Sequence, residues 1–166
     1  NSLKTLHDKL MRNIMQWKNS EVYAPGILKE NTYLNTTLLL QDINKNLEHK
    51  NETEIETHPV FLASYLHQNL IHTPPFADGN GRITRLLTNN LLLQTGYSPI
   101  IIHEQEKNKY LNLLDKNIID NNKRQEVTPE VLNFFLDKQI LALNNIYEKI
   151  KTGIQQEKNK NNSLNI

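Results

Sequence analysis

Apolar residues recur at helical spacing along most of this 166-residue chain. The first such stripe repeats every three or four residues, as the buried side of a helix does. Its members are Leu3, Leu6, Leu10, Ile14 and Trp17. Further helices are predicted at 37–47, 59–72, 80–95, 104–119 and 129–151. A turn or short hairpin is predicted at 23–34, around Pro25-Gly26. The pattern predicts an all-α helical bundle with one small β-hairpin.

Local signals mark several helix ends. Pro59 and Pro129 suit the first helical position, and Gly96 suits the position just past a helix end. The chain is long enough for a single core, so we expect one domain over residues 1–154. The Asn- and Lys-rich residues 155–166 are expected to form a polar tail after a helix that stops near Gly153. The start, Asn1-Ser2-Leu3, lacks Met, as a fragment of a longer protein would.

Composition narrows the function classes. The formal net charge is +1, which gives no reason to expect a nucleic-acid partner or an anionic membrane surface. No apolar run is long enough to predict a membrane span. The chain has no cysteine, so disulfides and thiol catalysis are excluded. These features suit the cytoplasm, and the abundance of Asn, Lys and Ile suggests a bacterial source.

The candidate functional residues lie in the segment 75–85. Residues 74–85 read PPFADGNGRITR. Gly79 and Gly81 flank Asn80, so the backbone can bend sharply and bring amides close to an anion. A predicted helix starts here, and its N-terminal amides and dipole favour phosphate. Arg82 and Arg85 lie three residues apart on the first turns and could clamp phosphate oxygens.

Asp78 precedes the turn directly. A carboxylate in this position could hold Mg²⁺ against the same phosphates. The residues therefore predict a site for a phosphorylated ligand with Mg²⁺ as cofactor.

At these residues the chain resembles the Fic (filamentation induced by cAMP) family, whose motif reads H-x-F-x-[D/E]-G-N-G-R-x-x-R. The similarity extends from Ala63 to Ile100 and can be aligned there without gaps. It implies a Fic-type helical bundle and an AMP transfer from ATP to Ser, Thr or Tyr hydroxyls of a target protein, and it links the chain to cell filamentation. It also implies that Gly79, Asn80 and Gly81 cradle the α- and β-phosphates.

The motif departs from the family at one position. In the ungapped alignment, Pro74 occupies the place of the catalytic histidine, and His72 lies two residues earlier. Either Pro74 replaces the histidine, or two residues are inserted after His72. We favour replacement, because it keeps Leu70 on the apolar face of the preceding helix, where the insertion would put Gln68.

The replacement bears on activity because a neutral hydroxyl needs a base to take its proton. A positioned base typically contributes 10²–10⁴-fold to the rate, and proline has no proton acceptor. One hypothesis is a protein adenylyltransferase in which His72 serves as the base. The alternative is a Fic-fold binding or regulatory module that holds ATP–Mg²⁺ without transfer. Away from a catalytic role, His72 is expected to be a solvated helix-end residue.

The resemblance implies two kinds of protein partner. Ile27, Leu28 and Lys29 occupy the place of the family's flap, which pairs with the target backbone as an added strand. The family's inhibitory pattern [S/T]-x-x-x-E-[G/N] is missing from the sequence. Restraint could therefore come from a separate inhibitory protein or from a truncated segment, or there is no activity to restrain.

Other residues are expected to be structural or accessory. Phe76 and His67 should be buried packing residues, and His103 should start a helix. By resemblance, Tyr97 is expected on the adenine side of the pocket.

Overall fold

The computed structural model describes residues 2–11, 29–48, 57–116 and 126–163, and within them it is helical with no strand. The elements in chain order are α1 (Ser2–Met11), α2 (Glu30–Glu48), α3 (Pro59–His72), α4 (Asn80–Gln94), the short 3₁₀ helix η3 (Glu104–Glu106), α5 (Lys107–Lys116) and α6 (Pro129–Ser163). The all-α prediction is confirmed. None of the described helices is long and apolar enough to cross a bilayer.

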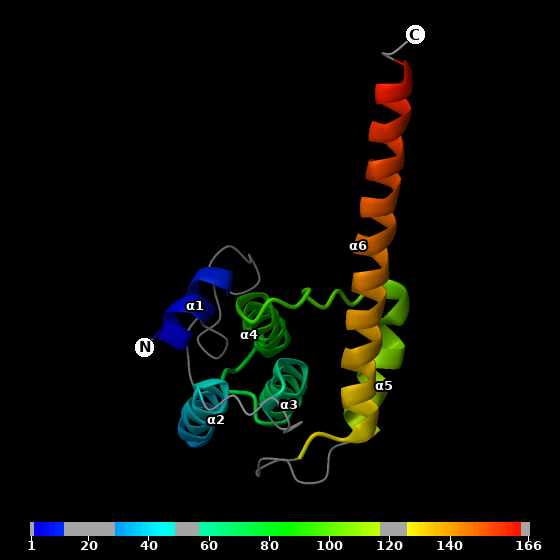
Figure 1. Ribbon diagram of the computed structural model, residues 1–166. Coiled ribbons are helices and arrows are strands. Elements are labelled where there is room, and N and C mark those ends of the chain that lie inside the picture. Colours follow the sequence, from blue (N-terminus) through cyan, green and yellow to red (C-terminus); the bar gives the residue numbers. More distant parts are fainter. Residues whose placement is uncertain (1, 12–28, 49–56, 117–125, 164–166) are drawn as a thin grey trace.

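Helix α3 is the centre of the bundle. It packs against α2, α4 and α6, while α1 lies against α4 and α5 lies against α6 (Figure 1). Because neighbours cover it on several sides, most of its residues are buried, including the polar Ser64, His67, Gln68 and Asn69. The core that surrounds it is made of aliphatic residues and one Phe from α2, α3, α4, α6 and the segment after α4. Its buried members are Leu39, Ile43, Val60, Leu62, Ala63, Leu66, Leu70, Leu91, Leu92, Ile100, Val131 and Phe135.

Several helix ends follow the signals in the sequence. Pro59 is the first residue of α3, and His58 precedes it as N-cap, with its Nδ1 accepting the Val60 N–H at 3.2 Å. Helix α4 ends at Gln94, and Gly96 follows with φ of 86°, a left-handed conformation that suits glycine. The predicted starts and ends of α3 and α4 are therefore confirmed.

Two predictions along the chain are wrong. Residues 30–34, expected in the hairpin, form the first turns of α2, and the rest of that hairpin at 23–28 lies outside the described residues. Helix α6 does not stop near Gly153 but continues to Ser163. Gly153 has no positive φ, so it does not act as a terminating residue.

A buried polar side chain connects α3 to the segment that leads into α6. Gln68 is fully buried, and its Nε2 donates to the Glu126 carbonyl at 2.9 Å while its Oε1 accepts the Thr128 N–H at 3.3 Å. Both of its partners precede α6, so one glutamine ties the entry of α6 to the central helix. A buried amide with both ends satisfied stabilises such a junction, whereas an unsatisfied one would destabilise it.

Candidate functional site

The glycine turn before α4 has the conformation that the sequence predicted. Gly79 is the N-cap of α4 with φ of 76° and ψ of 5°, a left-handed conformation that a residue with a Cβ rarely adopts. Its carbonyl accepts the N–H groups of Arg82 and Ile83, each at 3.1 Å. Within the described part of the chain, the N–H groups of Asn80 and Gly81 make no hydrogen bond, as is normal for the first helical residues. These two amides are the donors that a bound anion could use.

The side chain of Asn80 shapes the turn. Its Nδ2 donates to the Phe76 carbonyl at 2.8 Å, and its Oδ1 accepts the Phe76 N–H at 2.9 Å. Both ends of the amide are therefore occupied by the backbone four residues earlier. Asn80 can still contribute its backbone N–H to a ligand, but its side chain closes the loop.

Phe76 anchors the loop in the protein, as predicted. Its side chain is fully buried and stacks on the imidazole of His7 from α1, with ring centroids 3.8 Å apart and planes 8° from parallel. The Nε2 of His7 also lies 2.6 Å from the Asp78 carbonyl oxygen. Burial lowers the pKa of His7, and the hydrogen bond to Asp78 opposes that shift. A neutral His7 can donate its Nε2–H to that carbonyl, so α1 stabilises the loop through this contact.

His7 was missed by the sequence reasoning. It lies 71 residues before Asp78, next to an apolar stripe in which nothing marks it as a support of the loop. Only the packing of α1 against α4 brings it there.

The two arginines lie on the exposed side of α4. Both Arg82 and Arg85 are exposed. A Cβ added to Gly81 would lie 3.4 Å from Nη1 of Arg85, so the guanidinium folds back over the first turn of the helix. The structure therefore brings Arg85 next to the predicted phosphate turn.

Asp78 is exposed, and its Oδ1 accepts the Gly79 N–H at 2.5 Å. No hydrogen-bond partner of its second carboxylate oxygen appears among the described residues. Nor do these residues contain any cluster of three or more His, Asp or Glu that could hold a metal. A single carboxylate still fits Mg²⁺, which commonly takes one or two carboxylates and completes its shell with phosphate oxygens and water.

A cavity of about 370 Å³ opens beside Arg85. Its walls come from α4, the segment before η3, η3 itself and α5, with Arg85, Ile102, His103, Glu104, Lys107, Tyr110 and Leu111 as lining residues. Two cationic side chains, Arg85 and Lys107, against one acid, Glu104, make the lining suited to an anionic group. A hollow of about 670 Å³ between α5 and α6 is larger, but none of the predicted site residues lines it.

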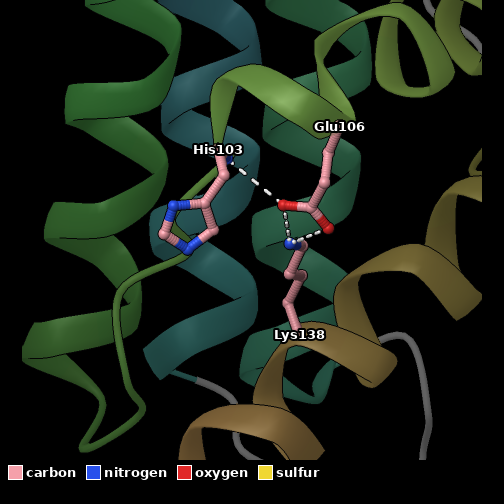
Figure 2. Close-up of polar contacts among 3 residues, drawn as sticks. All are labelled: His103, Glu106 and Lys138. Atoms are coloured by element: carbon pink, nitrogen blue, oxygen red, sulfur yellow. Dashed lines mark hydrogen bonds and ion pairs between the residues drawn. The ribbon is translucent and has the colours of Figure 1, made fainter.

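An ion pair holds the outer wall of this cavity. Lys138 of α6 contacts both carboxylate oxygens of Glu106, at 2.6 and 2.5 Å, and the same carboxylate accepts the His103 N–H at 3.2 Å (Figure 2). The hydrogen bond from Lys138 lowers the pKa of Glu106. His103 caps η3, as predicted. The start of α5 is therefore fastened to α6, which fixes where Lys107 and Tyr110 face Arg85.

His67 forms a buried polar link behind the cavity. Its Nε2 lies 2.5 Å from the Tyr110 hydroxyl and its Nδ1 lies 3.2 Å from Oγ1 of Thr88. Burial, with a smaller effect from the positive charge of Arg85, lowers the pKa of His67 to about 3. Burial raises the pKa of Tyr110 to about 12. Both groups are therefore neutral at pH 7, and the prediction that His67 is a structural residue is confirmed.

The prediction that His72 is solvated is wrong. His72 is the last residue of α3, only 6% exposed, and its Nε2 lies 3.4 Å from the Leu114 carbonyl of α5. Thr73 ends the helix, with its N–H and its hydroxyl both donating to the Asn69 carbonyl at 2.9 and 2.6 Å. Pro74 follows outside any helix and is half-buried. The imidazole of His72 is thus held against α5 within the core.

The other predicted site residues are placed only in part. Ile27 and Leu28 lie outside the described residues, and the Lys29 N–H donates to the Pro75 carbonyl at 2.8 Å. Tyr97 was expected beside the nucleotide, but its hydroxyl lies 3.0 Å from Nε2 of His58, at the opposite end of α3 from the glycine turn. The expectation for Tyr97 is wrong, because α4 carries it about 20 Å from the turn.

Comparisons of the sequence with known proteins agree on one family. A model of the Fic/DOC family matches residues 1–92, more than half of the chain. A protein adenylyltransferase Fic of Drosophila persimilis is 37% identical over 99 residues, which is 60% of this chain and 19% of that protein. One of Drosophila erecta is 36% identical over 115 residues, covering 66% of this chain and 22% of that protein. The chain therefore spans about a fifth of the length of these relatives.

A solved structure agrees with this family. The crystal structure of a Fic domain containing signaling protein from Bacteroides thetaiotaomicron superposes with a TM-score of 0.68 at 26% identity. The match covers 85% of this chain and 60% of that one.

Proposed function

This chain belongs to the Fic/DOC family, and we propose that it binds ATP with Mg²⁺ at the turn before α4 as a domain related to the protein adenylyltransferases. The observation that carries the proposal is the left-handed Gly79 at the N-terminus of α4, with the Arg85 guanidinium folded back over the same turn. Free helix amides and an adjacent cation together form an anion site.

In this proposal the residues divide the triphosphate between them. The N–H groups of Asn80 and Gly81 bind the phosphates nearest the turn, while Arg82 and Arg85 neutralise the remaining charge. Asp78 is the residue that would hold Mg²⁺, which would offset the negative charge of the phosphates. The 370 Å³ cavity beside Arg85 offers Lys107 and Tyr110 to the rest of the ligand, and its size is within the usual range for small-molecule sites.

The transfer step needs one more group. A target hydroxyl attacks the α-phosphorus, the bond to the β-phosphate breaks, pyrophosphate leaves and the hydroxyl proton goes to a base. In our alignment the base position is Pro74, which accepts no proton, and His72 is buried against the Leu114 carbonyl. We therefore propose that nucleotide binding is retained and that transfer is slow. The alternative, a binding or regulatory module with no transfer, rests on the same two residues.

Target docking and restraint remain parts of the proposal. The Lys29 N–H pairs with the Pro75 carbonyl inside the motif, so Lys29, one of the three proposed flap residues, lies at the turn. We propose that the flap aligns a target backbone there as an added strand. A separate inhibitory protein is one proposed source of restraint, since these 166 residues do not contain the family's inhibitory pattern.

Self-modification with labelled ATP tests the base position. Wild type, Pro74→His, Pro74→Ala and His72→Ala are compared, with ATP–Mg²⁺ affinity measured on each by calorimetry. We expect Pro74→His to raise transfer by about 10²–10⁴-fold at unchanged affinity. Pro74→Ala is the matched control, because it removes the ring without adding a base.

Rapid wild-type transfer that is lost in His72→Ala would contradict the replacement alignment. Absence of ATP binding in wild type would contradict the proposed function itself.

A further inference from the structure

Helix α6 carries a row of apolar residues that the domain does not cover. Its first turns bury Val131, Phe135 and Gln139 against the rest of the protein. Beyond them the helix projects away from the body, and its distal half stands free of the other described helices (Figure 1). A second row, here called the α6 seam, is exposed by 37–63% along this helix. Its members are Leu136, Ile140, Leu143, Tyr147, Ile150 and Ile154.

The spacing of the α6 seam is that of a coiled coil. Successive members are separated by four, three, four, three and four residues. This is the a/d repeat of a heptad, in which Ile140, Tyr147 and Ile154 take position a. An amphipathic helix on the surface of a globular domain normally turns its apolar row inward. Here the apolar row lies on a different side of α6 from Val131 and Phe135, so a partner could reach it without disturbing the core.

The seam is complementary to itself when two copies run antiparallel. Centring the pair on Asn145 sets Ile140 opposite Ile150 of the second copy, Leu143 opposite Tyr147, and Leu136 opposite Ile154. Every layer then joins an a residue to a d residue, both apolar. The next layer outward would join Asn133 to Glu157, so polar residues bound the seam at both ends.

Charge complementarity selects the antiparallel arrangement. In an antiparallel pair the e positions of the two helices face each other, and Asp137 lies opposite Lys151 of the second copy with an axial offset of about 3 Å. Symmetry gives this pair twice. A parallel pair would instead bring e against g positions, where the chain offers Gln139 with Asn144 and Ile146 with Lys151, without one opposite-charge pair. The existing contact between Lys151 and Glu148, 3.7 Å long and exposed, is a weak competitor.

The shape of the molecule allows this pairing. In the antiparallel arrangement the body of each copy lies beside the distal half of the other α6, which projects free of its own domain (Figure 1). A two-fold axis at Asn145 makes the same surface of both copies the interface, as closed dimers require. We propose that the α6 seam is the dimer interface of this chain, formed with a second copy as an antiparallel helix pair.

Sedimentation or light scattering on the 166-residue chain, from about 1 µM to about 500 µM, tests the proposal. We expect a concentration-dependent dimer. Leu143→Asp places a charge in the central layers and should weaken the dimer at least a hundredfold. Leu141→Asp is the matched control, because Leu141 is similarly exposed (52%, against 61% for Leu143) on the same helix but lies off the seam. Far-UV circular dichroism checks that both variants keep their helices.

A charge exchange tests the orientation. Asp137→Lys and Lys151→Asp should each weaken the dimer by about threefold to tenfold, whereas the double variant should return to within about twofold of wild type. A parallel dimer, or one formed elsewhere, would show no such recovery.

Cross-linking provides a second measure of orientation, since the chain has no cysteine of its own. With a short bismaleimide, Asn144→Cys should link two copies, because the two positions differ by about 3 Å along the axis. Ile154→Cys should not link them, since its copies lie about 27 Å apart.

A monomer throughout the concentration range would overturn the proposal. So would equal weakening by Leu143→Asp and Leu141→Asp, or efficient linking through position 154 in place of 144.

Discussion

The buried His67 predicts a specific loss of stability in mild acid. Its pKa is lowered to about 3 in the folded protein, mainly by burial, whereas an unfolded histidine titrates near 6.5. Between these values the unfolded chain binds a proton at this site and the folded protein does not. The free energy of unfolding must therefore fall as the pH drops from about 6.5 towards 3.

The size of the effect follows from the same two values. At pH 5 the linkage relation gives a loss of about 2 kcal/mol from this group, and at pH 7.5 almost none. His67 is only 2% exposed, so screening by water takes little away from this figure. The two hydrogen bonds of the neutral ring, to Tyr110 and Thr88, oppose protonation in addition, because the Tyr110 hydroxyl could no longer donate to Nε2.

The assay is urea unfolding followed by circular dichroism at several values between pH 7.5 and 5, on wild type and His67→Asn. Carboxylates and His7 also titrate with pH, but they contribute alike to both proteins. The difference between the two pH profiles should therefore be about 2 kcal/mol at pH 5. His103→Gln, which removes an exposed imidazole, is the control and should follow wild type. Parallel profiles for wild type and His67→Asn would refute the reasoning.

Three further predictions concern the turn and its support. Arg82→Ala and Arg85→Ala should each weaken ATP–Mg²⁺ affinity by about tenfold or more, because charge-assisted hydrogen bonds contribute about 1.5–3 kcal/mol. Unchanged calorimetric affinity in both variants would rule out the proposed binding of phosphate by the two arginines. Asp78→Ala should abolish the metal dependence of ATP binding. If wild type binds ATP equally tightly in EDTA, Asp78 has only a structural role, through its hydrogen bond from the Gly79 N–H. Phe76→Ala should cost about 3–5 kcal/mol in chemical denaturation, whereas Leu93→Ala, at a 59% exposed site, should stay within about 0.5 kcal/mol.

The sequence predicted those parts of the fold that local chemistry decides. Pro59 and Gly96 mark the boundaries of α3 and α4 because proline suits a first helical position and glycine tolerates a positive φ after the last one. Gly153 misled the prediction for the opposite reason. Glycine inside a helix costs about 1 kcal/mol relative to alanine, too little to end a helix without a left-handed turn or a proline. The turn signal at Pro25-Gly26 was likewise extended too far, into residues 30–34 that begin α2.

Burial of the histidines could not be predicted in this way. His72 ends a helix and precedes a proline-rich segment, which by local rules makes it solvent-exposed. It is buried because α5, more than thirty residues later, places the Leu114 carbonyl against it. The prediction for Tyr97 was wrong for a similar reason. Similarity to the family motif does not reveal that Tyr97, which follows α4, lies at the far end of this helix from the glycine turn.

The motif contains residues for two tasks, binding an anion and stabilising the loop, and the sequence alone does not separate them. In the proposed site the Asn80 and Gly81 amides and Arg85 would bind the anion, whereas the Asn80 side chain and Phe76 stabilise the conformation of the loop. Loss of binding in an Asn80→Ala variant would therefore report a loop that has opened, not a lost contact to phosphate. A variant that alters only the support, such as His7→Phe, separates the two tasks: it keeps the ring stacked on Phe76 but removes the hydrogen bond to the Asp78 carbonyl. If the hydrogen bond from His7 sets the orientation of the turn, His7→Phe should weaken nucleotide binding, although His7 itself lies on the inner side of the loop. Normal affinity in that variant would show that Asn80 and Phe76 alone set this orientation.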